Sequence, residues 1–130
     1  MSFDNLLKPG KIGTQELKNR IVMPAMGSEF PGKWGEVTDT MINWKARRAE
    51  GGAALVIVEC TFAATAVDPV RTLELSLRAD DERLIEGLSR LTEAIHKNGA
   101  KAGIQLTAGG GAQAMGGPWI PDLFSHPATR

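Results

Sequence analysis

The stretch GGAALVIVEC (residues 51–60) decides the fold. Two glycines open it, and the residues that follow are apolar without a break from Ala53 to Val58. The run is short, rich in β-branched residues and does not alternate with polar ones. This pattern is typical of a strand buried on both faces of a parallel sheet. We therefore expect a central strand over residues 53–60.

A helix is expected just before this strand, over residues 38–50. Thr38 suits the N-cap, because its hydroxyl can accept from a free N–H of the first turn. Gly51 is the expected left-handed stop of this helix. Spacings of three and four residues predict the apolar face. Its members are Ile42, Ala46 and Ala49.

A second helix is predicted over residues 80–99, capped by Asp80 or Asp81 and ended by Asn98-Gly99. Its apolar stripe is Leu84, Leu88, Leu91 and Ile95.

Strands are expected at 20–26, where Pro24 should end the ladder, and at 101–107. A hairpin turning at Gly13-Thr14 is expected over 11–19. The segments 28–37 and 61–79 are predicted loops. The order hairpin, β–α–β–α–β predicts an α/β protein with parallel strands.

The glycine-rich stretch GGGAQA (109–114) matches a dinucleotide-binding fingerprint by letter. That site needs a long helix after the glycines and an acidic residue about 20 positions further on. Gly116-Gly117-Pro118 stops any helix at once, and Asp122 has no apolar strand before it. We reject the Rossmann interpretation. A surface loop, or a ligand-binding loop at the end of a barrel strand, remains possible.

Composition excludes several function classes. The chain has 130 residues, with 15 basic and 15 acidic ones, so nothing in its charge favours nucleic-acid binding. The single cysteine excludes an internal disulfide and is typical of a reducing compartment. We find no signal-peptide pattern, no membrane-length apolar run and no metal-ligand motif. A cytoplasmic location without membrane attachment is the expectation.

Three phrases together resemble the Old Yellow Enzyme family of NADH:flavin oxidoreductases. They are KNRIVMPAMG (18–27), GGAALVIVEC (51–60) and HKNGAKAGIQLTAG (96–109). The resemblance implies a TIM (β/α)₈ barrel whose bottom is closed by the N-terminal hairpin. Such a barrel takes roughly 250 residues. Residues 1–130 would then be the N-terminal portion of an FMN-binding barrel domain, with about three βα units. Little activity and weak FMN binding are expected of these residues alone.

The resemblance also implies a cofactor site at the strand ends. FMN would be the bound cofactor and NAD(P)H the hydride donor. The amide of Gln105 could both donate to and accept from the pyrimidine edge of the flavin. The residues assigned to FMN are Pro24, Ala25, Met26, Gly27, Cys60 and Gln105. No catalytic residue is assigned, because the family's substrate-anchoring and proton-donating residues lie mostly further along the chain.

Some positions depart from the family pattern. Gly27 stands where some relatives carry a redox-tuning cysteine, and Ala108 and Gly111 replace a histidine and an arginine found in many others. The phrases QLTAG and PWIPDLFSHPATR are more similar to the enoate reductase and 2,4-dienoyl-CoA reductase branch. That branch reduces activated C=C bonds of small unsaturated molecules. It also implies a [4Fe–4S] cluster and an FAD-binding portion after the barrel.

Several alternatives stay open from the residues alone. A different barrel enzyme would need a Lys or carboxylate at a strand end, for which only Glu59 is available. A non-catalytic α/β module is the other alternative. Cys60 could be a packed hydrophobe, and Glu59 could be either a buried polar contact or a functional acid. Open sheet edges predict self-association.

Overall fold

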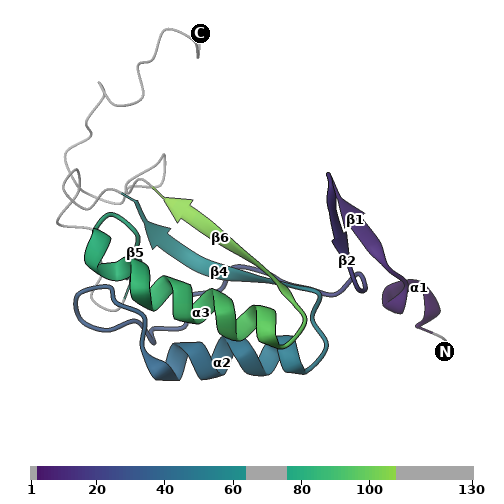
Figure 1. Cartoon of the computed structure of the whole chain (residues 1–130), viewed down its shortest axis with the longest axis horizontal. Coiled ribbons are helices and arrows are strands. Elements are labelled where there is room, and N and C mark those ends of the chain that lie inside the picture. The colour runs from purple at the N-terminus through teal and green to yellow at the C-terminus, as the bar shows by residue number, and fades with distance from the viewer. Residues whose placement is uncertain (1–2, 64–75, 108–130) are drawn as a thin grey trace, which may run out of the picture.

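The computed structural model describes residues 3–63 and 76–107, which form a small parallel sheet covered by helices. Strand β4 (Leu55–Phe62) is central and pairs in parallel with β3 (Val22–Met23), β5 (Leu77–Arg78) and β6 (Lys101–Thr107). Helices α2 (Asp39–Glu50) and α3 (Ile85–Lys97) lie side by side along one face of this sheet (Figure 1). The predicted α/β order with parallel strands is confirmed.

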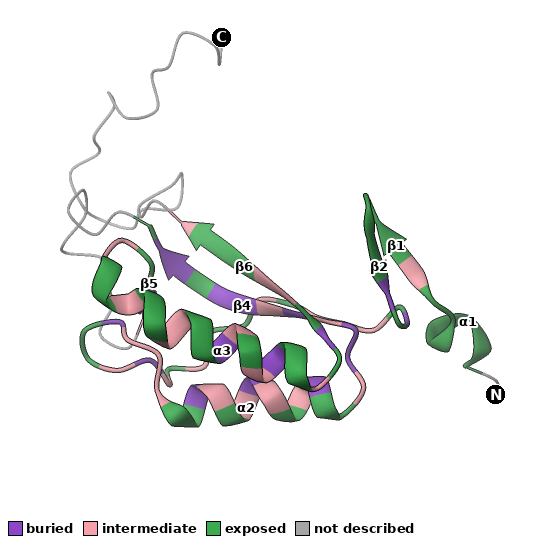
Figure 2. Ribbon diagram, in the orientation of Figure 1, coloured by how far each residue is buried: buried purple, intermediate pink, exposed green. Residues whose placement is uncertain are grey.

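The hydrophobic core lies between these two helices and the sheet. Figure 2 shows the buried residues gathered along β4 and on the facing parts of α2 and α3. The core consists of Met41, Ala49, Ala53, Val56, Val58, Leu77, Leu91, Ile95 and Ala100. The other face of the sheet carries no helix among the described residues. Cys60 and Gln105, near the carboxyl ends of β4 and β6, are exposed.

The predicted hairpin is present, and it lies at the opposite end of the molecule from the carboxyl ends of β4 and β6 (Figure 1). Strands β1 (Gly10–Ile12) and β2 (Gln15–Leu17) are antiparallel and turn at Gly13, whose φ is 57°. A short helix, α1 (Asp4–Leu7), precedes them and was not predicted. The Asn19 amide joins the hairpin to the sheet by donating to the carbonyl of Gly52 at 2.8 Å.

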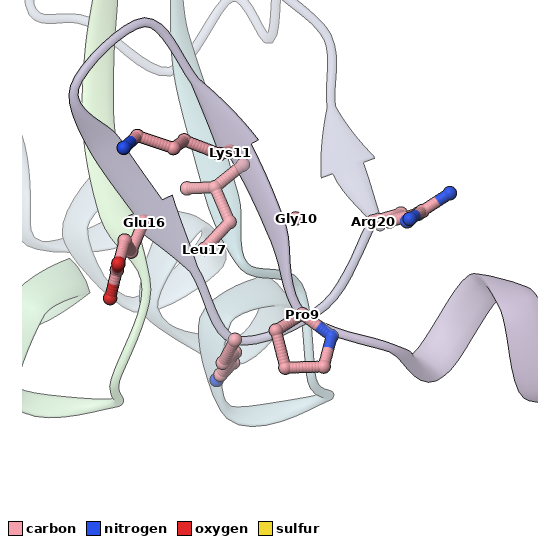
Figure 3. Close-up of a pocket in the computed structure, with 7 residues that line it drawn as sticks. Pro9, Gly10, Lys11, Glu16, Leu17 and Arg20 are labelled. Atoms are coloured by element: carbon pink, nitrogen blue, oxygen red, sulfur yellow. The ribbon is translucent and has the colours of Figure 1, made fainter.

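A shallow cleft lies against this hairpin (Figure 3). Its lining includes Pro9, Leu17 and Arg20, all from the hairpin region. The carboxyl ends of β4 and β6 lie at the far end of the molecule (Figure 1). The cleft is therefore separate from the face that carries the predicted cofactor residues.

Helix α2 begins as predicted, but its buried face and the glycine with positive φ that follows it differ from the prediction. The Thr38 hydroxyl accepts from the Met41 N–H at 3.2 Å, as expected. The buried stripe is Met41, Lys45 and Ala49, whereas Ile42 and Ala46 are only half-buried. Gly51 has a φ of −67°, so the predicted left-handed stop at Gly51 is wrong. Gly52 takes the positive φ instead, at 107°.

The second helix and last strand follow the sequence closely. Asp81 caps a 3₁₀ turn, η1 (Glu82–Leu84), that leads into α3, and Gly99 ends the connection with a φ of 73°. Leu91 and Ile95 are fully buried. The last strand has the predicted bounds, 101–107. The central strand begins two residues later than predicted and runs on to Phe62.

Some predictions are corrected by pairing that the sequence does not reveal. The first strand is only Val22–Met23, and the predicted loop 61–79 contains the end of β4 and all of β5. The stretch GGGAQA, Ala108 and the phrase PWIPDLFSHPATR lie outside the described residues. Within the described ranges, no helix is long and apolar enough to cross a membrane.

Candidate cofactor site at the strand ends

A β-bulge in β4 determines which side chains reach the open face of the sheet. Val58 pairs with Ile104, but the next pair is Cys60 with Gln105, so Glu59 is an extra residue. A bulge of this kind reverses the in-out alternation beyond it. Val56 and Val58 are buried on the helix side, and the bulge turns Cys60 to the opposite side.

Cys60 and Gln105 are thereby brought together on the open face. They are direct partners in the parallel ladder, and both side chains are exposed. The interpretation of Cys60 as a packed hydrophobe is wrong, since the thiol is free and exposed. Ile57 and Gly103 share this face one step earlier: a Cβ on Gly103 would lie 3.7 Å from the Ile57 side chain.

The segment after β3 supplies main-chain groups rather than side chains. β3 ends at Met23, directly before Pro24, as predicted. Among the described residues, the main-chain N–H groups of Ala25, Met26 and Gly27 have no hydrogen-bond partner. A Cβ on Gly27 would meet nothing within 4 Å. The described residues therefore leave room for a side chain at position 27, so sterics do not explain why this chain has glycine where some relatives carry a cysteine.

These features fit the polar edge of a flat heteroaromatic ring. Free main-chain N–H groups can donate to ring carbonyls and nitrogens, and the exposed Gln105 amide can both donate and accept. No side chain in this set is a strong acid or base. The described part of the site can therefore bind and orient a cofactor, and its chemistry would come from the cofactor.

A buried ion pair lies behind this face. Lys45 from α2 and Glu59 at the bulge are 3.4 Å apart, from Nζ to Oε2, and their side chains are 0% and 4% exposed. The other oxygen of Glu59, Oε1, accepts from the Ser28 N–H at 3.1 Å and from the Ser28 hydroxyl at 2.9 Å. The open question on Glu59 is resolved, because its carboxylate is a buried polar contact directed away from the open face.

The pKa of Lys45 is lowered from its usual value. Burial removes the ammonium from water and is the largest cause, which the negative charge of Glu59 partly offsets. Arg48 lowers the pKa further. Among the groups that affect this pKa, Glu59 is the carboxylate that favours the charged form of Lys45.

The loop that follows Ser28 is fixed to α2. The Ser28 Oγ accepts from the Phe30 N–H at 3.3 Å, and the Thr38 hydroxyl donates to the Phe30 carbonyl at 2.6 Å. Glu29, between them, has a φ of 58°. A non-glycine residue held in this left-handed region costs of order 1 kcal/mol, so its surroundings must impose the conformation.

Sequence reasoning identified the exposed members of this site but missed those that hold it. Lys45 and Ser28 were not singled out. The available signal was a lysine in the apolar stripe of the helix, at four residues from both Met41 and Ala49. The described ranges hold no group of three or more His, Cys, Asp or Glu residues suited to a metal.

The fold defines the class, which is part of a parallel (β/α) barrel. Comparison with known proteins gives the family. The sequence pattern of the "NADH:flavin oxidoreductase / NADH oxidase family" matches residues 5–118. The chain belongs to this family of FMN-dependent oxidoreductases.

Individual relatives agree. The chain is 36% identical over 106 residues to an NADH oxidase of Thermoanaerobacter brockii, covering 80% of this chain and 16% of that protein. It is 38% identical over 105 residues to a metal reductase of Desulforamulus reducens, covering 81% of this chain and 15% of that protein. The chain thus spans a small part of the length of these relatives.

Solved structures of the family show the same arrangement. Old Yellow Enzyme from Pichia sp. AKU4542 superposes with a TM-score of 0.71 at 32% identity, over 78% of this chain and 26% of that one. A 2-naphthoyl-CoA reductase complex gives a TM-score of 0.77 at 28% identity, over 84% of this chain and 16% of that one. The expected partial TIM barrel is confirmed.

Proposed function

We propose that this chain forms part of an FMN-dependent NAD(P)H oxidoreductase that reduces activated C=C bonds. Its open sheet face would hold the flavin at the strand ends. The observation that carries the proposal is the bulge at Glu59, because it places Cys60 beside Gln105 on the face next to the unpaired main chain of 25–27. Family membership supports the choice of cofactor.

In this proposal each group has a binding role. The Gln105 amide would meet the polar edge of the ring, the main-chain N–H groups of 25–27 would donate to it, and Cys60 would lie against it. When bound, FMN would accept a hydride from NAD(P)H and deliver it to an electron-poor carbon of the acceptor. These residues would orient the ring, and the other carbon of the reduced bond would take its proton from water or from a donor further along the chain, where the family resemblance implies the proton-donating residues.

The class of acceptor rests on the likeness to the enoate reductase and 2,4-dienoyl-CoA reductase branch. A coenzyme A thioester of an unsaturated acid is the kind of acceptor expected there. The single cysteine of this chain cannot supply the four thiolates of a [4Fe–4S] cluster. A cluster and FAD, if the enzyme uses them, would be held by other residues.

The test is a flavin assay on the full-length protein. The purified protein should show the visible absorption of oxidised flavin, which NADH or NADPH should bleach without oxygen. An α,β-unsaturated thioester should then restore the absorption, and a saturated thioester of equal length should not. A colourless protein that cannot be reconstituted with FMN would contradict the proposal. Restoration by both thioesters alike would contradict the acceptor class alone.

A further inference from the structure

One carboxylate connects the two chain segments that the proposed flavin site depends on. Glu59 is the bulge residue directly before Cys60, and its Oε1 accepts both donors of Ser28, the residue directly after Gly27. The bulge lies in β4, and the segment 24–27 follows the end of β3. Glu59 therefore connects the segment after β3 to the bulge in β4.

Lys45 determines how this carboxylate is held. Its Nζ lies 3.4 Å from Glu59 Oε2 and donates to the Ile57 carbonyl at 3.4 Å, also on β4. Glu59 Oε2 is buried and has no hydrogen-bond partner in the described part of the chain, so the ion pair with Lys45 is what restrains it. Without the ammonium, the buried carboxylate would lack a counter-ion, so it should turn toward water and lose its hydrogen bonds with Ser28.

Stability alone is a poor explanation for such an arrangement. A buried ion pair is often no more stable than well-packed apolar side chains of similar volume, and apolar pairs are simpler to bury. What an apolar pair cannot do is accept two hydrogen bonds from Ser28. Glu29, next to Ser28, is also held in a left-handed conformation. The pair thus maintains a specific main-chain geometry at the strand end.

We propose that Lys45 and Glu59 are positioning residues, which through Ser28 hold the main chain of residues 24–28 in place to receive the flavin ring. This inference rests on the proposed function. They touch no cofactor themselves, since both side chains lie on the helix side of the sheet. Their effect would be on the affinity and the electronic environment of the bound flavin.

The first experiment measures FMN binding by the full-length protein, through quenching of flavin fluorescence. Removing one hydrogen bond to a charged acceptor should weaken binding about tenfold in Ser28→Ala. Ser28→Thr keeps a hydroxyl and should restore most of the affinity. Lys45→Met should weaken binding at least as much as Ser28→Ala. The visible circular dichroism of bound flavin should change in Ser28→Ala and Lys45→Met.

Ile95→Val is the matched control for stability. Ile95 is fully buried in the last turns of α3, away from the strand ends, and the change removes one methyl group. Its melting temperature should fall while FMN affinity and flavin dichroism stay those of wild type. If Ser28→Ala and Lys45→Met behave like this control, the two residues are merely structural and the inference is overturned.

The second experiment needs no cofactor. Amide hydrogen exchange at Ser28 should be slow in the FMN-free protein and much faster in Glu59→Ala, which removes the acceptor, and in Lys45→Met, but unchanged in Ile95→Val. Equal exchange in all four proteins would overturn the positioning role. A wild type that binds no FMN would instead overturn the proposed function and the flavin part of the inference. The exchange result tells these two failures apart.

Discussion

Lys45→Met should destabilise the protein strongly, although the new side chain is of similar length. The change leaves the Glu59 carboxylate, 4% exposed, without its counter-ion. Removing one partner of a buried pair costs about 3–5 kcal/mol. The carboxylate can turn toward water and leave Ser28, which relieves part of this cost, so we expect the lower end, about 3 kcal/mol. For a barrel domain of roughly 250 residues that is a fall of about 6–12 °C in melting temperature.

The double variant Lys45→Met/Glu59→Gln separates the charge from the packing. Glutamine keeps a carbonyl oxygen for Ser28 and carries no charge. The double variant should therefore recover all but about 1 kcal/mol of the loss, so that the two changes are strongly non-additive. Urea unfolding followed by circular dichroism measures Lys45→Met, Glu59→Gln and the double variant.

Arg47→Met, on the same helix, is the control that shows whether burial or a short distance between the charges gives an ion pair its strength. Arg47 and Glu50 are closer, at 2.9 Å, but their side chains are 76% and 57% exposed. Because water screens such a pair, the change should cost less than about 1 kcal/mol. Equal losses for Lys45→Met and Arg47→Met, or additive effects in the double variant, would refute the argument that burial gives the pair its strength.

Three further predictions follow from particular contacts. The pKa of Lys45 is below its usual value because of burial, so between that pKa and 10.5 the unfolded chain binds more protons than the folded one. The free energy of unfolding of wild type relative to Lys45→Met should thus rise as the pH is raised toward 10.5 in urea titrations; a fall would mean that Glu59 outweighs desolvation. Gly35→Ala should cost about 1–3 kcal/mol, since Gly35 has a φ of 81° and an added Cβ would overlap the Arg78 side chain; a melting temperature equal to that of wild type would contradict this. Leu106 is 59% exposed on β6, which pairs only with β4 in the described ranges. If this edge self-associates, Leu106→Lys should shift size-exclusion elution toward the monomer, and an unchanged profile would count against the edge.

The sequence predicted the elements whose pattern is local. The apolar run 53–58 indicated a buried parallel strand, and residues 101–107 became β6 with the predicted bounds. Thr38 and Gly99 took their expected places at a helix N-terminus and after a helix end. These predictions succeeded because hydrophobic spacing and capping are properties of neighbouring residues.

The features that were missed depend on residues far apart in the chain. The bulge at Glu59 cannot be seen in LVIVEC, because a continuous apolar run has no alternation to be broken. Lys45 is polar by type, and only its partner Glu59, 14 positions away, explains why it is buried. Strand β5 has two residues, so its pairing with β4 rather than its sequence makes it a strand.

FMN titration of Gln105→Leu tests the central claim most directly, since Gln105 is the side chain assigned to the ring edge. Gln15→Leu is the matched control, because Gln15 is equally a glutamine on an exposed strand position but lies in the hairpin, at the other end of the sheet. We predict that Gln105→Leu weakens FMN binding about tenfold while Gln15→Leu binds like wild type. Equal affinity of both variants and wild type would contradict a flavin site at the strand ends.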